Sequence, residues 1–483
     1  KFLLDFFLKK KSRRNFIKKS SLIGSGIFIV PRNVLGGVGF VAPSDQLNIG
    51  AIGAGGKGSD IRESWASKER VVALCDVHPL GKHGVIQSRK KYPNAKFYVD
   101  FNELLDKEKD LDAVTISTPD HTHGVIGNRA MNKGLHVYIQ KPLTHNIEEA
   151  RQLTITAKKN KVITQMGNQG GSCIGVERVK EWIDTKKIGD INKVYAWTDR
   201  PVWPQGFKMP EPSASKPEDL EWDLWLGPAK EMAYRPEFHP FNWRGWWDYG
   251  TGALGDMGCH ILDLPVKALN LGYPKDVECS VAKIYEKMWS PNYYPEGPPA
   301  ASLVTLHFKK NNKTNSDLEL VWMDGGIIPP RPEVIPAEDY LGEKGNTNGV
   351  LIIGKEGVIS SGVYGLNPKL YRKGKKTLHL NTDKIYNKNN GLDHIHHKEW
   401  IDAIKGGYGS KEYKKLTAPI EYAGPFTETV LIGNIALRSY MIKDGTDFIG
   451  RKKLLWDGEN TRITNFDLAN KFVGRVRRPG WDL

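Results

Sequence analysis

The sequence predicts an α/β protein, with an N-terminal Rossmann domain built on a doubly wound parallel sheet and a C-terminal α+β domain with an open, mostly antiparallel sheet. Residues 47–58 join a short apolar run to glycines in G-x-G-x-x-G spacing. Apolar runs then alternate with helical stretches as far as residue 165, whereas strand-like runs follow one another after residue 277. We expect three regions: an export signal and linker at 1–43, a nucleotide-binding domain at 44–167, and a substrate-binding domain at 168–483.

The glycine-rich stretch predicts a dinucleotide-binding turn. Leu47 to Ile52 has the length of a buried strand, and the glycines follow it directly. The first glycine permits the tight turn, the second lets the backbone approach a pyrophosphate, and the third lets the next helix pack on the strand. The N-terminus of that helix favours phosphate. The chain has 50 glycines, so the pattern alone is a weak signal. The residues expected to bind the cofactor here are Gly53, Gly55, Gly56, Lys57 and Gly58.

Asp76 strengthens the nucleotide interpretation and indicates which cofactor binds. Arg70 to Cys75 predicts a second buried strand, and Asp76 follows it. An acidic side chain there can accept hydrogen bonds from the adenosine ribose and would repel a 2′-phosphate. NAD is therefore expected rather than NADP. The alternative is an ordinary polar residue in the turn after the strand.

The remaining Rossmann elements alternate along the chain. Strands are expected at 96–99, 112–119, 135–139 and 162–166, and helices at 83–92, around 101–105, at 124–133 and at 147–160. Open α/β sheets bind ligands at the carboxyl ends of their strands.

Two of these strand ends carry polar side chains, in the stretches 118–123 and 140–142. A lysine held at such an end can donate to a substrate hydroxyl and stabilise an alkoxide, although a solvated surface lysine is the alternative. The cofactor contacts expected from the two ends are Thr118, Pro119, His121, Gln140 and Lys141, with Lys141 also expected to be catalytic.

A polar link and an aromatic stretch follow the Rossmann domain. The link at 167–171 supplies Asn168 and Gln169 as expected substrate contacts. Seven of the 14 tryptophans lie between residues 195 and 250. Aromatic faces can hold the C–H faces of sugar rings, but about half of these side chains are expected to pack in the core. Trp247 and Tyr249 are the expected sugar contacts.

Asp256 and His260 form the second catalytic candidate. Their i, i+4 spacing places both on one face of a helix. The imidazole can take a hydroxyl proton while the carboxylate fixes its tautomer. The alternative is a capping aspartate with a core histidine.

The rest of the chain predicts an antiparallel sheet and two helices. Strands are expected at 277–285, 300–308, 318–323, 349–353 and 358–361, and helices at 393–404 and 423–441. His394, His396 and His397 could suggest a metal, but no carboxylate spacing matches, so surface histidines are expected and no metal site. The scattered Cys75, Cys173, Cys259 and Cys279 indicate buried thiols rather than disulfides.

The net charge of +15 does not indicate nucleic-acid binding. Residues 1–43 carry nine Lys and Arg against one acid, and no basic run elsewhere is interleaved with aromatics.

The N-terminal segment predicts export by the twin-arginine route. Ser12 to Lys18 reads S-R-R-N-F-I-K, and the apolar run 21–30 is too short to span a bilayer. No clear cleavage site follows, so an uncleaved N-terminal anchor stays open. A periplasmic or membrane-associated location is expected.

Together these residues resemble the Gfo/Idh/MocA family, the glucose–fructose oxidoreductase and inositol dehydrogenase group. The resemblance covers about residues 45–445. Its motifs are the glycine turn, Asp76, Thr118-Pro119, Gln140-Lys141-Pro142 and Gly255-Asp256-x-Gly-x-His260-x-x-Asp263. Gln140 departs from the glutamate that is usual in the family. The aromatic stretch and the export motif resemble a secreted bacterial subset.

The resemblance implies a tightly bound NAD, a carbohydrate substrate in the C-terminal domain, and a homodimer or homotetramer. It also gives Lys141, Asp256 and His260 the task of holding the substrate hydroxyl and passing on its proton. We expect an NAD-dependent oxidoreductase that acts on a sugar CH–OH group and restores its cofactor within each cycle. The alternatives are an NAD-dependent glycosidase that works by transient oxidation and elimination, and a sugar-binding protein without activity. Related glycosidases carry a Tyr/His segment where this chain has 256–260.

Overall fold

The computed structural model describes residues 45–62, 68–212, 215–386 and 391–483. The chain divides into two compact units, Lys1–Gln46 and Leu47–Leu483, and everything below concerns the second. The export motif and the anchor lie outside the described residues. Within the described part of the chain, no helix has both the length and the apolar character needed to cross a membrane.

The N-terminal part of the second unit is a Rossmann domain, as predicted. Its six strands run in the order β3-β2-β1-β4-β5-β6, and every pair is parallel. The strands are β1 (Asn48–Ile52), β2 (Arg70–Cys75), β3 (Lys96–Tyr98), β4 (Ala113–Ile116), β5 (His136–Gln140) and β6 (Thr164–Gly167). All residues of β4 and β6 are buried, as expected for central and covered strands of a parallel sheet.

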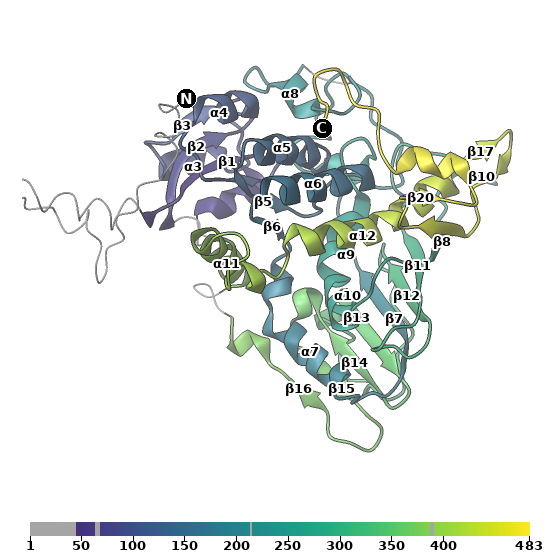
Figure 1. Ribbon diagram of the computed structural model, residues 1–483. Coiled ribbons are helices and arrows are strands. Elements are labelled where there is room, and N and C mark those ends of the chain that lie inside the picture. Colours follow the sequence, from purple (N-terminus) through teal and green to yellow (C-terminus); the bar gives the residue numbers. More distant parts are fainter. Residues whose placement is uncertain (1–44, 63–67, 213–214, 387–390) are drawn as a thin grey trace, which may run out of the picture. The chain divides into compact units, whose positions relative to one another are not determined.

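Helices cover both faces of this sheet (Figure 1). They are the 3₁₀ helix η2 (Gly56–Arg62) and the α-helices α3 (Val85–Lys91), α4 (Phe101–Lys107), α5 (Asp120–Asn132) and α6 (Ile147–Asn160). The helix expected after the glycine turn is thus a 3₁₀ helix within the described residues. Helix α5 begins four residues earlier than the predicted start at 124, because Pro119 fits the extended position directly before a helix.

The C-terminal part contains the predicted open sheet. Ten strands run in the order β16-β15-β14-β13-β7-β12-β11-β8-β19-β20, with only the β7–β12 pair parallel among the described residues. The strands are β7 (Ile191–Thr198), β8 (Asp276–Val281), β11 (Ser302–Phe308), β12 (Leu318–Met323), β13 (Asn348–Gly354), β14 (Gly357–Ser361), β15 (Lys369–Tyr371), β16 (Leu378–His379), β19 (Leu454–Asp457) and β20 (Arg462–Ile463). Two short hairpins lie outside it: β9 (Tyr285–Lys287) with β10 (Ser290–Pro291), and β17 (Lys443–Asp444) with β18 (Asp447–Phe448).

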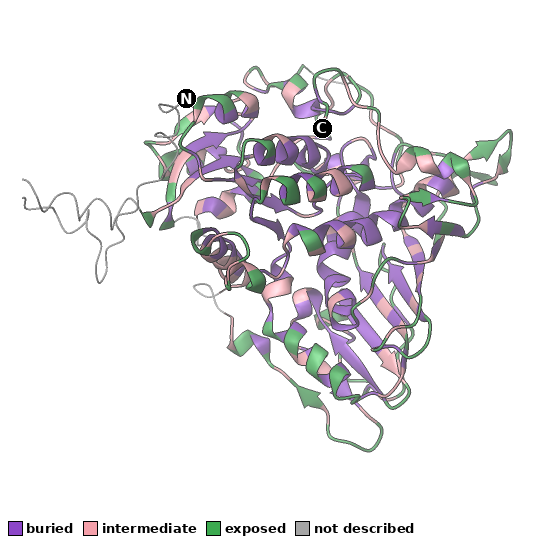
Figure 2. Cartoon of the chain, in the orientation of Figure 1, coloured by how far each residue is buried: buried purple, intermediate pink, exposed green. Residues whose placement is uncertain are grey.

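The helices of the C-terminal part are α7 (Ile174–Asp184), α8 (Trp222–Leu226), α9 (Gly252–Ile261), α10 (Asp263–Ala268), α11 (Leu392–Gly406) and α12 (Ile420–Tyr440). Of these, α9 and α12 pack on strands of the second sheet, whereas α11 contacts β6 of the Rossmann sheet. Helix α12 packs against α6 of the Rossmann domain, against α9 and against the sheet. It is mostly apolar and largely buried, as Figure 2 shows. It therefore ties the nucleotide-binding sheet to the second sheet.

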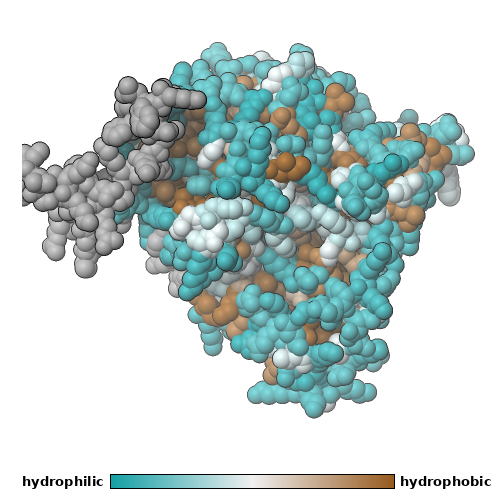
Figure 3. All heavy atoms as spheres, viewed as in Figure 1, coloured by the Kyte–Doolittle hydropathy of each residue, from teal (hydrophilic) through white to brown (hydrophobic). Residues whose placement is uncertain are grey.

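On the face drawn in Figure 3, hydrophilic residues predominate and hydrophobic residues form small separate groups.

The interpretation of His396 and His397 as surface histidines is wrong. Both lie on the inner face of α11, at 0% and 2% exposure. His396 Nε2 lies 2.8 Å from the Met166 carbonyl oxygen, and the His397 ring packs against Tyr138 at 4.1 Å between centroids. The polar neighbours in the sequence suggested a solvated helix start, whereas tertiary packing turns these two rings inward.

Candidate active site

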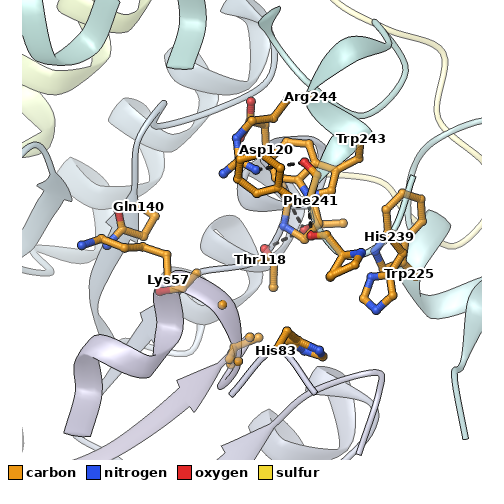
Figure 4. A pocket seen from close by; sticks show the side chains of 18 of the residues that line it. Lys57, His83, Thr118, Asp120, Gln140, Trp225, His239, Phe241, Trp243 and Arg244 are labelled. Atoms are coloured by element: carbon orange, nitrogen blue, oxygen red, sulfur yellow. Dashed lines mark hydrogen bonds between the residues drawn. The ribbon is translucent and has the colours of Figure 1, made fainter. Parts of the chain in front are cut away.

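A cavity of about 590 Å³ lies where the strand ends of the Rossmann sheet meet the aromatic segment and α9 (Figure 4). Its lining joins parts of the chain that are far apart in the sequence. The residues that matter below are Gly53, Gly55, Gly56, Lys57, Asp76, Thr118, Pro119, Asp120, Gln140, Lys141, Gln169, Arg200, Trp203, Trp225, Phe241, Trp243, Arg244, Asp256, His260 and Tyr364.

The glycine turn has the geometry that its sequence predicts. Gly53 has φ +76°, and a Cβ there would lie 2.8 Å from the Ser117 backbone. A Cβ on Gly58 would lie 1.7 Å from the Gly53 carbonyl oxygen, so this buried glycine packs inside the turn and does not line the cavity. Gly56, at φ +49°, faces open space. The turn is therefore tight on its inner side and accessible to a ligand on its outer side.

Asp76 follows β2 and binds the backbone of the glycine turn. Its carboxylate accepts hydrogen bonds from the Gly55 N–H at 3.0 Å and the His78 N–H at 3.0 Å. Lys57 also lines the cavity, but its ammonium group is paired with Asp60 and Asp393 at 2.5 and 3.2 Å. Burial lowers the pKa of Lys57, but these two carboxylates outweigh burial and raise it. Lys57 is therefore a charged group beside the turn.

Lys141 and Asp256 meet in the cavity as a buried ion pair. Lys141 Nζ lies 2.7 Å from Asp256 Oδ1 and also donates to the Asp256 carbonyl oxygen at 2.8 Å. Arg244 Nε lies 3.2 Å from the same carboxylate oxygen. Burial by itself would raise the pKa of Asp256, but the two cations hold it well below its ordinary value. Asp256 is thus a permanent carboxylate that holds the Lys141 side chain in place.

His260 lies one helical turn further along α9 and has a different partner. Its Nδ1 lies 3.2 Å from Asn168 Oδ1, and its ring meets Tyr364 edge-on at 4.7 Å. Burial, reinforced by the charge of Lys141, lowers the pKa of His260 well below its ordinary value. The neutral ring can donate from Nδ1 to Asn168 and keep a lone pair on Nε2. Asn168, rather than the expected Asp256, is therefore the residue hydrogen-bonded to this ring.

Besides Gly58 and Asn168, three expected contacts lie outside the cavity lining. The His121 ring nitrogens lie 3.3 and 2.9 Å from the carbonyl oxygens of Tyr249 and Trp225. Tyr249 itself packs in a buried aromatic cluster, and the Trp247 N–H donates to the Glu296 carbonyl oxygen. These polar and aromatic side chains pack inside the protein. The sequence alone does not distinguish such packing from contact with a ligand.

Other aromatic residues occupy the position expected for Trp247 and Tyr249. Trp203, Trp225, Phe241 and Trp243 line the cavity. The Arg244 guanidinium lies 4.2 Å from the Trp243 ring centroid and 4.8 Å from that of Phe241. Flat apolar faces beside a forked cation can hold a polar ring from its face and its edge.

Sequence reasoning missed several residues of the lining. Arg244 had a detectable signal, because it is a cation within the aromatic stretch, and Asp120 lies between residues already singled out. Arg200 and Tyr364 had none, because only the fold brings these loop residues to the cavity. Tyr364 has φ 62°, a left-handed conformation that is uncommon outside glycine and is found at functional sites.

The lining fits a dinucleotide. Gly56 leaves open space at the turn, and among the described residues the buried Gln169 Oε1 has no hydrogen-bond partner, as expected for a group that meets a ligand. A glycine turn at the switch point of a 3-2-1-4-5-6 sheet defines the class of dinucleotide-binding α/β proteins.

Comparison with known families agrees with the class of dinucleotide-binding α/β proteins and identifies one family within it. Residues 47–168 match the family described as oxidoreductase, NAD-binding Rossmann fold, and residues 186–283 match its C-terminal alpha/beta domain. The chain belongs to this family, Gfo/Idh/MocA, and residues 47–168 are its NAD-binding domain. The predictions of the family, the fold and the cofactor are confirmed.

Individual relatives cover less of the chain. A glycosyl hydrolase family 109 protein of Solibacter usitatus is 32% identical over 164 residues, 31% of this chain and 37% of that protein. The WlbA dehydrogenase of Bordetella pertussis, solved with NADH and UDP-GlcNAcA, has a TM-score of 0.54 at 14% identity, covering 81% of this chain and 97% of that one. An inositol dehydrogenase homolog of Azotobacter vinelandii, solved with NADH and myo-inositol, has a TM-score of 0.51 at 16% identity, covering 81% and 95%. The structural likeness establishes the fold.

Proposed function

We propose that the protein is an NAD-dependent oxidoreductase that acts on a CH–OH group of a sugar or sugar derivative. The observation that carries this proposal is the convergence of Lys141, Asp256 and His260 in the cavity that also contains the glycine turn. The aromatic faces around Arg244 support a carbohydrate as the substrate. The NADH-bound sugar dehydrogenase and the inositol dehydrogenase homolog that share this fold agree with it.

The side chains divide the proton chemistry between them. His260 Nε2 takes the hydroxyl proton, because the ring is neutral and Asn168 can hold the other nitrogen as the donor. Lys141 donates to the substrate oxygen and stabilises the negative charge that develops there. Asp256 positions Lys141 without acting as a base, since its charge is already paired. NAD, when bound, supplies the hydride acceptor.

The proposal includes two features of the whole protein. Export by the twin-arginine route would place the enzyme where no free NAD pool exists, so its cofactor would have to be restored within each cycle. A homodimer or homotetramer is proposed as well, which light scattering of the purified chain measures.

An NAD-dependent glycosidase is the second candidate. The glycosyl hydrolase family 109 relative favours it, although that match covers 31% of this chain. Oxidation of a sugar hydroxyl to a transient ketone would acidify the neighbouring C–H, and elimination would then release the aglycone. Water would add to the resulting double bond, and the hydride would return to the ketone. The same lysine and histidine would serve both reactions.

Lys141→Met tests the proposal. Removing the ammonium group should lower kcat by about 10²–10⁴-fold on any active sugar, while bound NAD remains measurable by its absorbance. Lys133→Met is the matched control, because Lys133 is also paired with a carboxylate but is exposed, directly after the end of α5. Unchanged turnover in Lys141→Met would contradict the proposed role.

A panel of free sugars and nitrophenyl glycosides separates the two candidates. With one sugar and no second substrate, the oxidoreductase should leave its bound cofactor in the reduced form, which absorbance at 340 nm measures. The glycosidase should release nitrophenol with no net change in the cofactor. If NAD is bound but neither signal is seen, the protein would be a sugar-binding protein without activity.

A further inference from the structure

Three histidines meet at the cavity end next to Asp76. His78 follows β2, His83 precedes α3, and His239 comes from the aromatic segment of the second domain. One ring nitrogen from each lies within 4.8 Å of the other two. In Figure 4, His83 belongs to the ribbon of the Rossmann domain and His239 to the ribbon of the aromatic segment, and their ring centroids lie 5.4 Å apart. Nothing in the proposed reaction uses this cluster.

The spacing of the nitrogens is close to that of metal ligands. His78 Nδ1 lies 2.9 Å from His239 Nε2, and the ring centroids of the three pairs lie 5.1, 5.4 and 5.7 Å apart. A tetrahedral ion with bonds of about 2.0–2.1 Å places its ligand nitrogens roughly 3.4 Å apart. Small rotations of the rings therefore suffice to reach that geometry.

Carboxylates flank two of the three rings. Asp219 Oδ1 lies 3.4 Å from His78 Nε2, and the Leu80 N–H holds the other Asp219 oxygen at 2.8 Å. Asp76 Oδ1 lies 3.3 Å from His83 Nε2. Metal-binding histidines usually donate their second ring N–H to a carboxylate, which orients the ring and makes it a better ligand.

A glycine allows the two Rossmann histidines to converge. A Cβ at Gly81 would lie 2.3 Å from His83 Cε1 and 2.9 Å from His78 Cγ. Any other residue in this turn would push the rings apart. The backbone is therefore compatible with the cluster only because residue 81 has no side chain.

We propose that His78, His83 and His239 bind a Zn²⁺ ion. Imidazole nitrogens suit this ion, and a water molecule can complete a tetrahedral site. The ion would join the connection between β2 and α3 to the aromatic segment, and so fix the wall of the cavity beside the glycine turn. This proposal concerns ligand binding only and stands whether or not the sugar reaction is correct.

Calorimetric titration of the untagged full-length protein with ZnCl₂, after treatment with a chelator, tests the site. We expect one equivalent to bind, with affinity at least about 10-fold weaker in His239→Gln and in His83→Gln. His379→Gln removes an exposed histidine of β16 and should bind as the wild type does. Circular dichroism verifies that each variant is folded.

Zinc soaks of crystals give a second readout that does not depend on variants. An anomalous peak within bonding distance of all three ring nitrogens would support the site. Absence of both stoichiometric binding and the peak would overturn it. So would equal affinity in His239→Gln and the wild type, since the ion would then lie elsewhere, and the histidines would be polar packing groups near the nucleotide.

Discussion

At the residue scale, the chemistry of His260 depends on its two different neighbours. Lys141 adds positive charge, and burial removes water, so both favour the neutral ring. Asn168 accepts from Nδ1 without adding a charge. The ring is therefore a base that remains unprotonated below the pH at which an ordinary histidine takes up a proton. Activity should accordingly persist below pH 6.5, the usual histidine pKa.

Asn168→Asp tests this arrangement, because it should shift the pKa of His260 in a known direction. A carboxylate 3.2 Å from Nδ1 favours the imidazolium form, so the pKa of His260 should rise. The acidic limb of the kcat/KM profile should move to higher pH, by about one unit or more. Asn168→Ala should instead lower kcat by about 10-fold or more and leave that limb near its original pH. Identical limbs in the wild type and Asn168→Asp would contradict the role of His260 as the base.

At the scale of elements, side chains of helix α9 contact residues that follow two strands of the Rossmann sheet. Asp256 and His260 lie one turn apart on this helix, so one side chain faces Lys141 after β5 and the other faces Asn168 after β6. Their i, i+4 spacing correctly predicted a shared face. It could not predict separate partners, because those depend on the strand ends across the cavity.

Helices α6 and α12 are joined by an ion pair whose carboxylate, Glu428, is buried while Arg151 is one third exposed. Arg151 donates to both carboxylate oxygens of Glu428, at 2.6 and 2.8 Å, and Trp456 Nε1 also donates to Glu428. Burial raises the pKa of Glu428 in spite of the arginine, so this carboxylate depends on its partner. Arg151→Met should destabilise the fold by about 3–5 kcal/mol, since it leaves a buried carboxylate unpaired. Urea unfolding measures this loss.

The exposed pair of Lys193 and Glu319 is the matched control. Their side chains lie 2.7 Å apart on the second sheet but remain about one third exposed. Lys193→Met should cost less than about 1 kcal/mol. Equal losses in the two variants would mean that the α6–α12 pair is not the contact that joins the domains.

The elements with a clear period or motif were predictable from the sequence. The range of α6 was predicted without error, and β11, β12 and α12 differ from their predicted ranges by a few residues at most. The site was predictable where a motif defines the backbone, as at Gly53 and Lys141. Trp247 and Tyr249 show the limit, because an aromatic side chain suits a core and a sugar site equally well. Arg200 and Tyr364 reach the cavity by tertiary contacts that no local pattern encodes.

At the scale of the whole molecule, buried histidines should set the response to acid. Burial is the main cause that lowers the pKa values of His121, His396 and His397, each to about 3. In the unfolded chain these rings titrate near 6.5. Below pH 6.5 the unfolded state therefore binds protons that the folded state does not, so stability is full above that pH and falls as the pH decreases toward 3.

The expected loss is about 1.4 kcal/mol per pH unit for each of these histidines. Urea unfolding at pH 7, 6 and 5 should show a midpoint that falls steadily. His397→Phe is the sharpest variant, because among the described residues neither of its ring nitrogens has a hydrogen-bond partner. This variant should lower the slope of the unfolding free energy against pH by about 1.4 kcal/mol per pH unit, the contribution of one histidine. The phenyl ring should still pack on Tyr138. A midpoint that does not change between pH 7 and 5 would show that the folded protein takes up these protons without cost.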